Sequence, residues 1–167
     1  MIIREWEIKD FMGIISLIQN ELGYDDISSD IYDRIMRIYR DDNYQTFVAE
    51  DNGTVVGFVG IMRGLALELD GEYVRVIALA VSGSYRNNGV GTMLETHVED
   101  YAHQTGANSI VISSGLRRLD AHSFYEKRGY AKKGYSFIKL LETEEKFSYD
   151  DLYMPIPSRL GTDDDAE

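Results

Sequence analysis

The segment from Val76 to Leu94 constrains the fold of this 167-residue chain more than any other. It begins with six apolar residues, Val76 to Val81. A short apolar run bounded by turn-forming residues predicts a strand that is buried on both faces. Two glycines follow, Gly89 and Gly91, and apolar residues then recur at the spacing of an amphipathic helix. The segment therefore predicts a strand, a glycine-containing loop and a helix.

A loop of this kind is suited to bind phosphate. Glycines let the backbone come close to a ligand, and the first turn of a helix presents unpaired N–H groups and the positive end of its dipole. Arg86 adds a cation at the start of the loop. A dinucleotide-binding fold fits less well, because it needs a third glycine where Leu94 stands. A tight turn that needs glycine only for steric reasons remains the alternative.

The loop resembles that of a known family. Arg86, Gly89 and Gly91 form the pattern Arg-x-x-Gly-x-Gly behind a strand, which resembles the pyrophosphate loop of the GNAT superfamily of N-acetyltransferases. Members of that superfamily bind acetyl-coenzyme A. A second block looks like the family's Ala-x-x-Phe-Tyr-x-x-x-Gly-Tyr segment, with matching residues at Ala121, Phe124, Tyr125, Gly129 and Tyr130. The resemblance covers about residues 1–140.

The resemblance implies an α/β fold, the GNAT acyl-CoA N-acyltransferase fold, with a mixed sheet and splayed central parallel strands. The periodicity of the chain agrees with the element order β-α-α-β-β-β-α-β-α-β. Asn52-Gly53 predicts a two-residue hairpin turn, and Gly64 predicts a bulge or bend in the following strand. We expect strands at 2–8, 46–50, 55–62, 72–81, 109–113 and 135–140. We expect helices at 11–22, 89–105 and 120–129, and another helix that Ser28 or Ser29 caps, with Ile31, Ile35, Ile38 and Tyr39 on its inner face.

The resemblance also implies where the cofactor, acetyl-coenzyme A, would bind. The last strand residues before the loop would offer backbone groups to the pantetheine arm, and the loop amides would hold the pyrophosphate. The predicted cofactor-binding residues are Leu79, Ala80, Val81, Arg86, Asn87, Asn88, Gly89, Val90, Gly91, Thr92, Phe124 and Tyr125.

Candidate catalytic residues follow from the same register. Tyr125 is the candidate general acid, because its phenol would donate a proton to the leaving thiolate. Some family members have a glutamate base where Arg75 stands, so that base is missing here. Glu72 is the candidate water-mediated base, and Glu21 and Tyr24 are alternatives. The chain has no cysteine, which favours direct attack by the amine over an acetyl-enzyme.

These features together predict an N-acetyltransferase that transfers an acetyl group from acetyl-CoA to a primary amine. Acidic residues around the first two helices favour a small cationic amine as the acceptor, and a protein amino group is also compatible. The missing glutamate at Arg75 keeps an alternative open, which is a non-catalytic acyl-CoA-binding sensor or interaction module.

Composition limits the possible partners. The net charge of −12 argues against nucleic-acid binding. No apolar run is long enough to span a membrane, and the first residues do not resemble a signal peptide, so we expect a cytoplasmic protein. The three histidines show no metal-ligand spacing, and we expect no metal site. A homodimer is compatible with the sequence.

The character of the chain changes after residue 141. We expect an acetyltransferase domain over 1–141 and an acidic C-terminal extension over 142–167. Within this extension, the aromatic-rich part 147–157 is expected to dock on folded protein, whereas the acidic end 158–167 is expected to be mobile.

Overall fold

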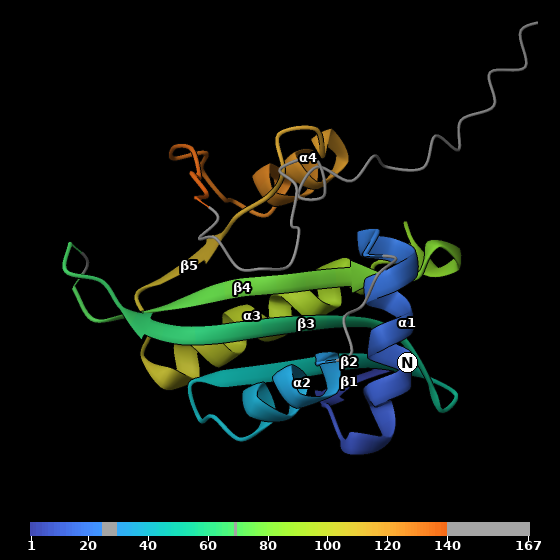
Figure 1. The fold of residues 1–167 in the computed structure, drawn as a ribbon. Helices are drawn as coiled ribbons and strands as arrows, with labels where there is room; N and C mark the ends of the chain where they lie inside the picture. The colour runs from blue at the N-terminus through green and yellow to red at the C-terminus, as the bar shows by residue number, and fades with distance from the viewer. Residues whose placement is uncertain (25–29, 69, 140–167) are drawn as a thin grey trace, which may run out of the picture. The chain divides into compact units, whose positions relative to one another are not determined.

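A computed structural model describes residues 1–24, 30–68 and 70–139 (Figure 1). The chain divides into two compact units, of which the first runs from Met1 to Ser114 and the second begins at Gly115. The expected boundary at 141 and the expected extension 142–167, with its docked part 147–157 and mobile part 158–167, lie outside the described residues.

The first unit is built on a mixed sheet of five strands, as described for these residues, in the order β1-β2-β3-β4-β5 (Figure 1). The pairs β1–β2, β2–β3 and β3–β4 are antiparallel, and β4 and β5 are parallel. This arrangement confirms the predicted mixed sheet. The strands are β1 (Ile2–Glu5), β2 (Tyr44–Asp51), β3 (Thr54–Leu65), β4 (Glu72–Val81) and β5 (Ser109–Ile112).

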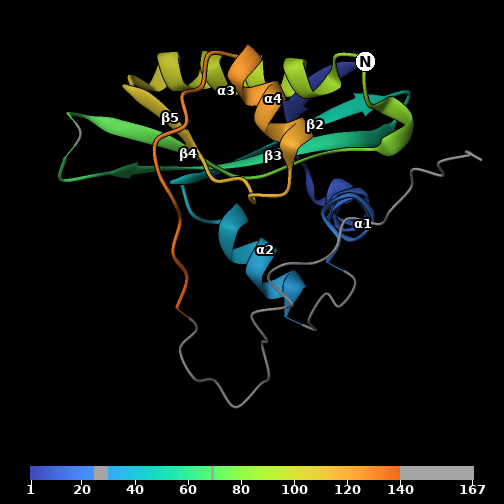
Figure 2. The ribbon, with the colours of Figure 1, turned by 90° about the horizontal axis from the view of Figure 1, so that it is seen from above.

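Helices cover both faces of the sheet. Figure 2 shows α3 along one face and α1 and α2 along the other. Gly23 and Gly106, both with positive φ, end α1 and α3 as expected from the sequence. The helices of the first unit are the 3-10 turn η1 (Ile8–Asp10), α1 (Phe11–Leu22), α2 (Ile31–Tyr39), the 3-10 turn η2 (Gly83–Tyr85) and α3 (Val90–Thr105).

Two separate apolar cores result, one on each face of the sheet. Strand side chains alternate between the faces, so each strand supplies residues to both cores. The α3-side core contains Phe47, Ala49, Val56, Val59, Ile61, Val74, Val76, Val90, Leu94, Val98 and Ala102. The α1-side core contains Trp6, Ile14, Ile15, Leu17, Ile35, Val48, Phe58 and Ala80.

Helix α1 lies very close to β3 at Gly13. A Cβ atom added at Gly13 would lie 2.9 Å from Cβ of Val55. The Cβ of Val55 is fixed to the backbone and has no rotamer that relieves such a contact. The absence of a side chain at Gly13 therefore sets how closely α1 packs on the sheet.

We predict that Gly13→Ala destabilises the protein by about 1–2 kcal/mol, although alanine favours a helix over glycine by about 1 kcal/mol. The expected loss arises because α1 must move away from β3. Urea unfolding of the variant would measure it, with Met12→Ala, a change at the neighbouring exposed side chain, as the control. A Gly13→Ala protein more stable than wild type would contradict the close approach.

A buried ion-pair network joins the start of the chain to the sheet. Arg4 in β1 donates to both carboxylate oxygens of Asp10, at 2.7 and 2.9 Å, and to Glu50 in β2 at 2.6 Å. The backbone N–H of Glu7 also donates to Asp10, at 2.8 Å. The hydrogen bond from Arg4 lowers the pKa of Asp10 below its ordinary value of 3.8, against the opposing effect of burial. The position of Asp10 directly before α1 is typical of an N-cap, but its side chain makes no bond to that helix.

The lowered pKa of Asp10 predicts an acid-dependent contribution to stability. The ionised form is favoured in the folded state, so the contribution is present above pH 3.8 and is lost as the pH falls towards the lower folded-state pKa. We expect Asp10→Asn to destabilise the protein at pH 7 and to have a smaller effect at pH 3. Urea unfolding at both pH values would show this. The exposed Asp42→Asn change is the control, and an equal effect of Asp10→Asn at both pH values would refute the prediction.

Strand β4 changes its surroundings at Ile77. Against β3, Val76 pairs with Ile61 and Ala78 pairs with Gly60, so Ile77 is the extra residue of a β-bulge. Before the bulge Val74 and Val76 point into the α3-side core, and after it Leu79 and Val81 pack there. Pairing with the parallel neighbour β5 also ends here, at Val76 and Ile112. We call the opening beyond this point, along residues 77–81, the fork.

Three expectations about the strands are wrong. Burial of β4 on both faces fails at the bulge residue Ile77, which is 42% exposed. Gly64 does not interrupt β3, which runs on to Leu65; the bulge lies at Ile77 instead. No strand forms over 135–139, where the exposed side chains of Tyr135, Phe137 and Ile138 have no strand to pair with in the described part of the chain.

The second unit contains α4 (Leu119–Lys127). Gly129 follows it with φ +90°, and the N–H of Tyr130 donates to the carbonyl of Tyr125 at 3.0 Å. The rings of Phe124, Tyr125 and Tyr130 pack edge to face in series, with centroids 5.2 and 5.6 Å apart. The helix and its glycine stop agree with the sequence, although the helix begins one residue before Asp120.

Candidate active site

The fork leaves one edge of β4 open within the first unit. Residues 77–81 continue to pair with β3, but no strand described in the structure pairs with them on the other side. The N–H and C=O groups along such an edge are available to an extended ligand that carries amide groups. The edge therefore suits a chain-like molecule lying parallel to β4.

The loop between β4 and α3 has the backbone shape that an anion site needs. Asn87 has φ 61° and Gly89 has φ 81°, both in the left-handed region. The first helical hydrogen bond runs from the N–H of Met93 to the carbonyl of Gly89, at 2.9 Å. The N–H groups of the first turn therefore have no partner within the helix, and Gly89 has no side chain to cap them. We call residues 86–92 the phosphate loop.

Close packing on the sheet fixes where α3 begins. A Cβ atom added at Gly57 in β3 would lie 3.1 Å from the carbonyl oxygen of Ala80, 3.2 Å from Leu94 and 3.3 Å from Val90. A larger residue at this position would push the first turn of α3 away from the sheet. The absence of a side chain at Gly57 thus determines how close the start of α3, and with it the phosphate loop, lies to the end of β4.

Helix α1 holds the loop from the other side. The carboxylate of Glu21 accepts a 2.8 Å bond from the N–H of Gly83 and a 2.6 Å bond from the guanidinium of Arg86. Arg86 also donates to the carbonyl of Val81 at 3.4 Å. We call these contacts the Glu21 clamp. The positive charge of Arg86 is thereby balanced, and its side chain is positioned across the end of β4.

A second tie reaches the loop from β2. The hydroxyl of Tyr85 donates to the carboxylate of Asp51 at 3.1 Å. This hydrogen bond raises the pKa of Tyr85, because the phenol donates to a negatively charged group. The residues before the phosphate loop are therefore anchored to both α1 and the β2–β3 turn.

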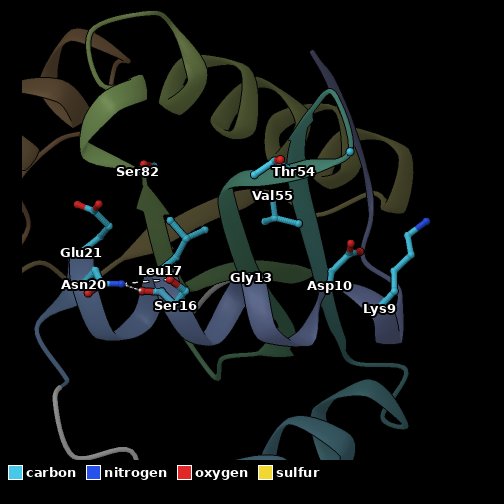
Figure 3. A pocket seen from close by; sticks show the side chains of 11 residues that line it. Lys9, Asp10, Gly13, Ser16, Leu17, Asn20, Glu21, Thr54, Val55 and Ser82 are labelled. Carbon is cyan, nitrogen blue, oxygen red and sulfur yellow. Dashed lines mark hydrogen bonds between the residues drawn. The ribbon is translucent and has the colours of Figure 1, made fainter.

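A groove of about 560 Å³ lies between α1 and the β2–β3 turn (Figure 3). Its carboxylates already have cationic partners, since Asp10 binds Arg4 and Glu21 binds Arg86. The amide of Asn20 donates to Ser16. We assign no ligand to this groove. Its lining residues are Lys9, Asp10, Gly13, Ser16, Leu17, Asn20, Glu21, Gly53, Thr54, Val55 and Ser82.

The predicted pantetheine contacts lie along the fork. Leu79 and Val81 pack against the α3-side core, and Ala80 is buried in the α1-side core. Their side chains are thus used for packing, which leaves the backbone for a ligand, as the resemblance implies. The loop residues Asn87, Asn88, Gly89, Val90, Gly91 and Thr92 lie together at the start of α3. Their cofactor contacts stay predictions.

The candidate base Glu72 lies far from the fork. It is the first residue of β4, five residues or about 17 Å of strand before Ile77. Its carboxylate lies 3.7 Å from the guanidinium of Arg63. Alternation from Val74 puts Glu72 on the α3 side of the sheet. Its role as a base stays a prediction, and the geometry does not add support. Of the alternatives, Tyr24 is exposed after the end of α1, and Glu21 forms the clamp.

Phe124 and Tyr125 belong to the second unit, on α4. Both rings are half-buried within the aromatic series described above. Their contacts to the cofactor, and the role of Tyr125 as general acid, stay predictions.

No group of three or more histidine, cysteine or carboxylate side chains in 1–24, 30–68 and 70–139 lies close enough together to hold a metal ion. Among the helices of these same residues, none is long and apolar enough to cross a membrane.

The Glu21 clamp and the bulge at Ile77 have no signal in the sequence. Glu21 and Arg86 lie 65 residues apart, and nothing in the sequence indicates that their side chains form an ion pair. From the sequence, Glu21 was therefore only a possible base. The bulge at Ile77 lies inside an unbroken apolar run, where no change of periodicity is visible.

Comparison with known proteins agrees with this geometry. The family model described as acetyltransferase (GNAT) family matches residues 3–130, and the chain belongs to this family. Members of the family use acetyl-CoA as the acetyl donor. The chain is therefore an acetyltransferase, and the alternative of a non-catalytic binding module gains no support.

Two relatives and one solved structure illustrate the similarity. An uncharacterized N-acetyltransferase of Bacillus subtilis is 29% identical over 107 residues, which are 64% of this chain and 75% of the relative. The aminoalkylphosphonate N-acetyltransferase of Salmonella typhimurium is 29% identical over 128 residues, 77% of this chain and 80% of the relative. An aminoglycoside acetyltransferase from an uncultured soil metagenomic sample shares the fold, with a TM-score of 0.77 at 16% identity, covering 84% of this chain and 96% of that one.

We predict that Gly91→Glu weakens coenzyme A binding by about 100-fold, because it places bulk and negative charge at the uncapped first turn of α3. Calorimetric titration with coenzyme A would measure the change. Gly91→Ala is the matched control, since Gly91 lies within α3 without a positive φ and alanine adds no charge, and it should bind nearly as wild type. A folded Gly91→Glu protein with unchanged affinity would exclude the phosphate loop as the pyrophosphate site.

Proposed function

We propose that this protein transfers the acetyl group of acetyl-CoA to the nitrogen of a primary amine by direct attack. The observation that carries the proposal is the continuity of the fork with the phosphate loop. A strand with one open edge runs directly into a helix whose first N–H groups are uncapped. An extended ligand with a pyrophosphate at one end matches both features.

The cofactor fits this path in one direction. Its pyrophosphate would lie at the N–H groups of Val90, Gly91 and Thr92, and its pantetheine arm would run back along residues 77–81. From Val81 to Val76 the strand covers about 17 Å, so the thioester would approach the closed end of the fork. Backbone groups of β4 would then bond the amides of the arm and polarise the thioester carbonyl.

The chemistry needs no enzyme nucleophile. The amine nitrogen attacks the thioester carbonyl carbon, a tetrahedral intermediate forms, and the C–S bond breaks. The nitrogen loses one proton, and the departing thiolate is protonated by an acid or leaves as the anion. Because the chain contains no cysteine, an acetyl-cysteine intermediate is excluded. The phenol of Tyr125 is our candidate for the acid, and the base is unassigned.

The acceptor we propose is a small molecule. One relative is named for aminoalkylphosphonates, and a structure of the same fold is named for aminoglycosides. Both names denote small amines, and this favours a small-molecule acceptor over a protein amino group.

The test is an acceptor panel with purified full-length protein and acetyl-CoA. Thiol release would be followed continuously, and mass spectrometry would identify the acetylated product. Release above the hydrolysis background together with a product 42 Da heavier supports the proposal. Coenzyme A binding without release for every amine would overturn it.

We predict that Tyr125→Phe lowers kcat by about 10- to 1,000-fold with little change in coenzyme A affinity, because it removes only the hydroxyl. Steady-state kinetics with the best acceptor would measure this. Tyr130→Phe removes a hydroxyl from the neighbouring ring and is the matched control, expected to keep kcat within about twofold. An unchanged kcat for Tyr125→Phe would mean that the thiolate leaves without this phenol.

A further inference from the structure

The sheet contains three arginines, and one of them differs from the others. Arg4 in β1 binds the carboxylates of Asp10 and Glu50, and Arg63 in β3 lies near Glu72. Arg75 in β4 donates to the hydroxyl of Ser113, at 3.1 Å. Within the part of the chain that the structure describes, no carboxylate lies within ion-pair distance of Arg75. Arg75 as a residue is half-buried, its bond to Ser113 is exposed, and its guanidinium is thus a positive charge without an anion.

Arg75 lies on the α1–α2 face of the sheet. Val74 and Val76 on either side of it point into the α3-side core, so alternation puts Arg75 on the opposite face. On β3, Met62 pairs directly with Arg75, and a glycine lies two residues to either side of Met62. The ring of Tyr73 lies 3.4 Å from where a Cβ of Gly64 would be, and Ile77 lies 3.3 Å from where a Cβ of Gly60 would be.

The position of Arg75 along β4 matters for the reaction. It is one residue before Val76, where pairing with β5 ends, and its bond to Ser113 reaches across to the residue that follows β5. Arg75 therefore marks the closed end of the fork. If the pantetheine arm lies in the fork as proposed above, the thioester approaches this same point.

We propose that Arg75 binds an anionic group of the acceptor, and that the acceptors of this enzyme are small amines that carry a carboxylate, phosphate or phosphonate. This inference rests on the proposed function. A guanidinium offers a planar pair of N–H donors that matches such oxyanions, and a cation with no carboxylate beside it can accept one without losing an ion pair. Anchoring the anion at Arg75 holds the amine of a short acceptor beside the thioester.

This inference replaces the sequence-based expectation of a cationic acceptor. Acidic residues near the first two helices suggested that expectation, but the charge nearest the closed end of the fork is positive. A polyamine at this point would meet a like charge at short range. A zwitterionic amine would place its anionic group at the guanidinium and keep its amine nitrogen away from that positive charge.

Binding to the coenzyme A complex of the full-length protein tests the proposal without requiring turnover. Calorimetry would compare 2-aminoethylphosphonate, β-alanine, the neutral 3-amino-1-propanol and the cationic 1,3-diaminopropane. We expect at least one anionic amine to bind 10-fold or more tightly than aminopropanol. The phosphonate and carboxylate arms show which oxyanion is preferred. Arg75→Gln should abolish this preference, and Arg75→Lys should restore part of it.

Arg63→Gln is the matched control, since it removes an arginine of the same sheet from the opposite face, and it should keep the preference. The inference is overturned if aminopropanol or diaminopropane binds as tightly as both anionic amines, or if Arg75→Gln keeps the preference.

Thiol release with the same amines distinguishes failure of this inference from failure of the proposed function. Anion binding that depends on Arg75 without release for any amine would overturn only the proposed function. Release with an unaltered preference in Arg75→Gln would overturn only this inference.

Discussion

The structure depends on a single strand that changes its neighbours halfway along. Up to Val76, β4 is an interior strand paired with β3 and β5, and beyond Ile77 β3 is its one partner among the strands that the structure describes. The bulge at Ile77 shifts by one residue the alternation of side chains between the two faces of the sheet. Beyond the loss of pairing with β5, β4 still supplies side chains to both cores. An open backbone edge thus exists inside a well-packed unit, where an unpaired strand would otherwise be a liability.

The phosphate loop is positioned from both faces of the sheet. On the α3 side, Gly57 allows the first turn of the helix to sit close to the strands. On the α1 side, Glu21 binds the loop through one backbone N–H and one guanidinium. Neither contact involves the glycines of the loop motif. The backbone conformation of the phosphate loop is therefore supported by residues far from it in the sequence.

Much of the fold could be predicted because its signals are local. The Asn52-Gly53 turn has positive φ at both residues, and α1 and α3 end at glycines in the left-handed region. The strand expected over 135–140 failed for a non-local reason. A strand needs a hydrogen-bonding neighbour, and the alternating pattern of Tyr135 to Ile138 carries no information about one.

The candidate site also combines features that have a local sequence signal with features that depend on distant residues. The sequence by itself determined that a glycine-containing loop joins β4 to α3, since the φ of 81° at Gly89 is a local backbone requirement. It also showed that a base is missing at Arg75. Only the tertiary structure decided that Arg63 has a carboxylate nearby while Arg75 faces the other side of the sheet without one. Charge pairing depends on which strands lie together and on which face of the sheet a residue takes. Neither is visible in the sequence, and the bulge at Ile77 changes the face of the residues after it without altering the apolar pattern.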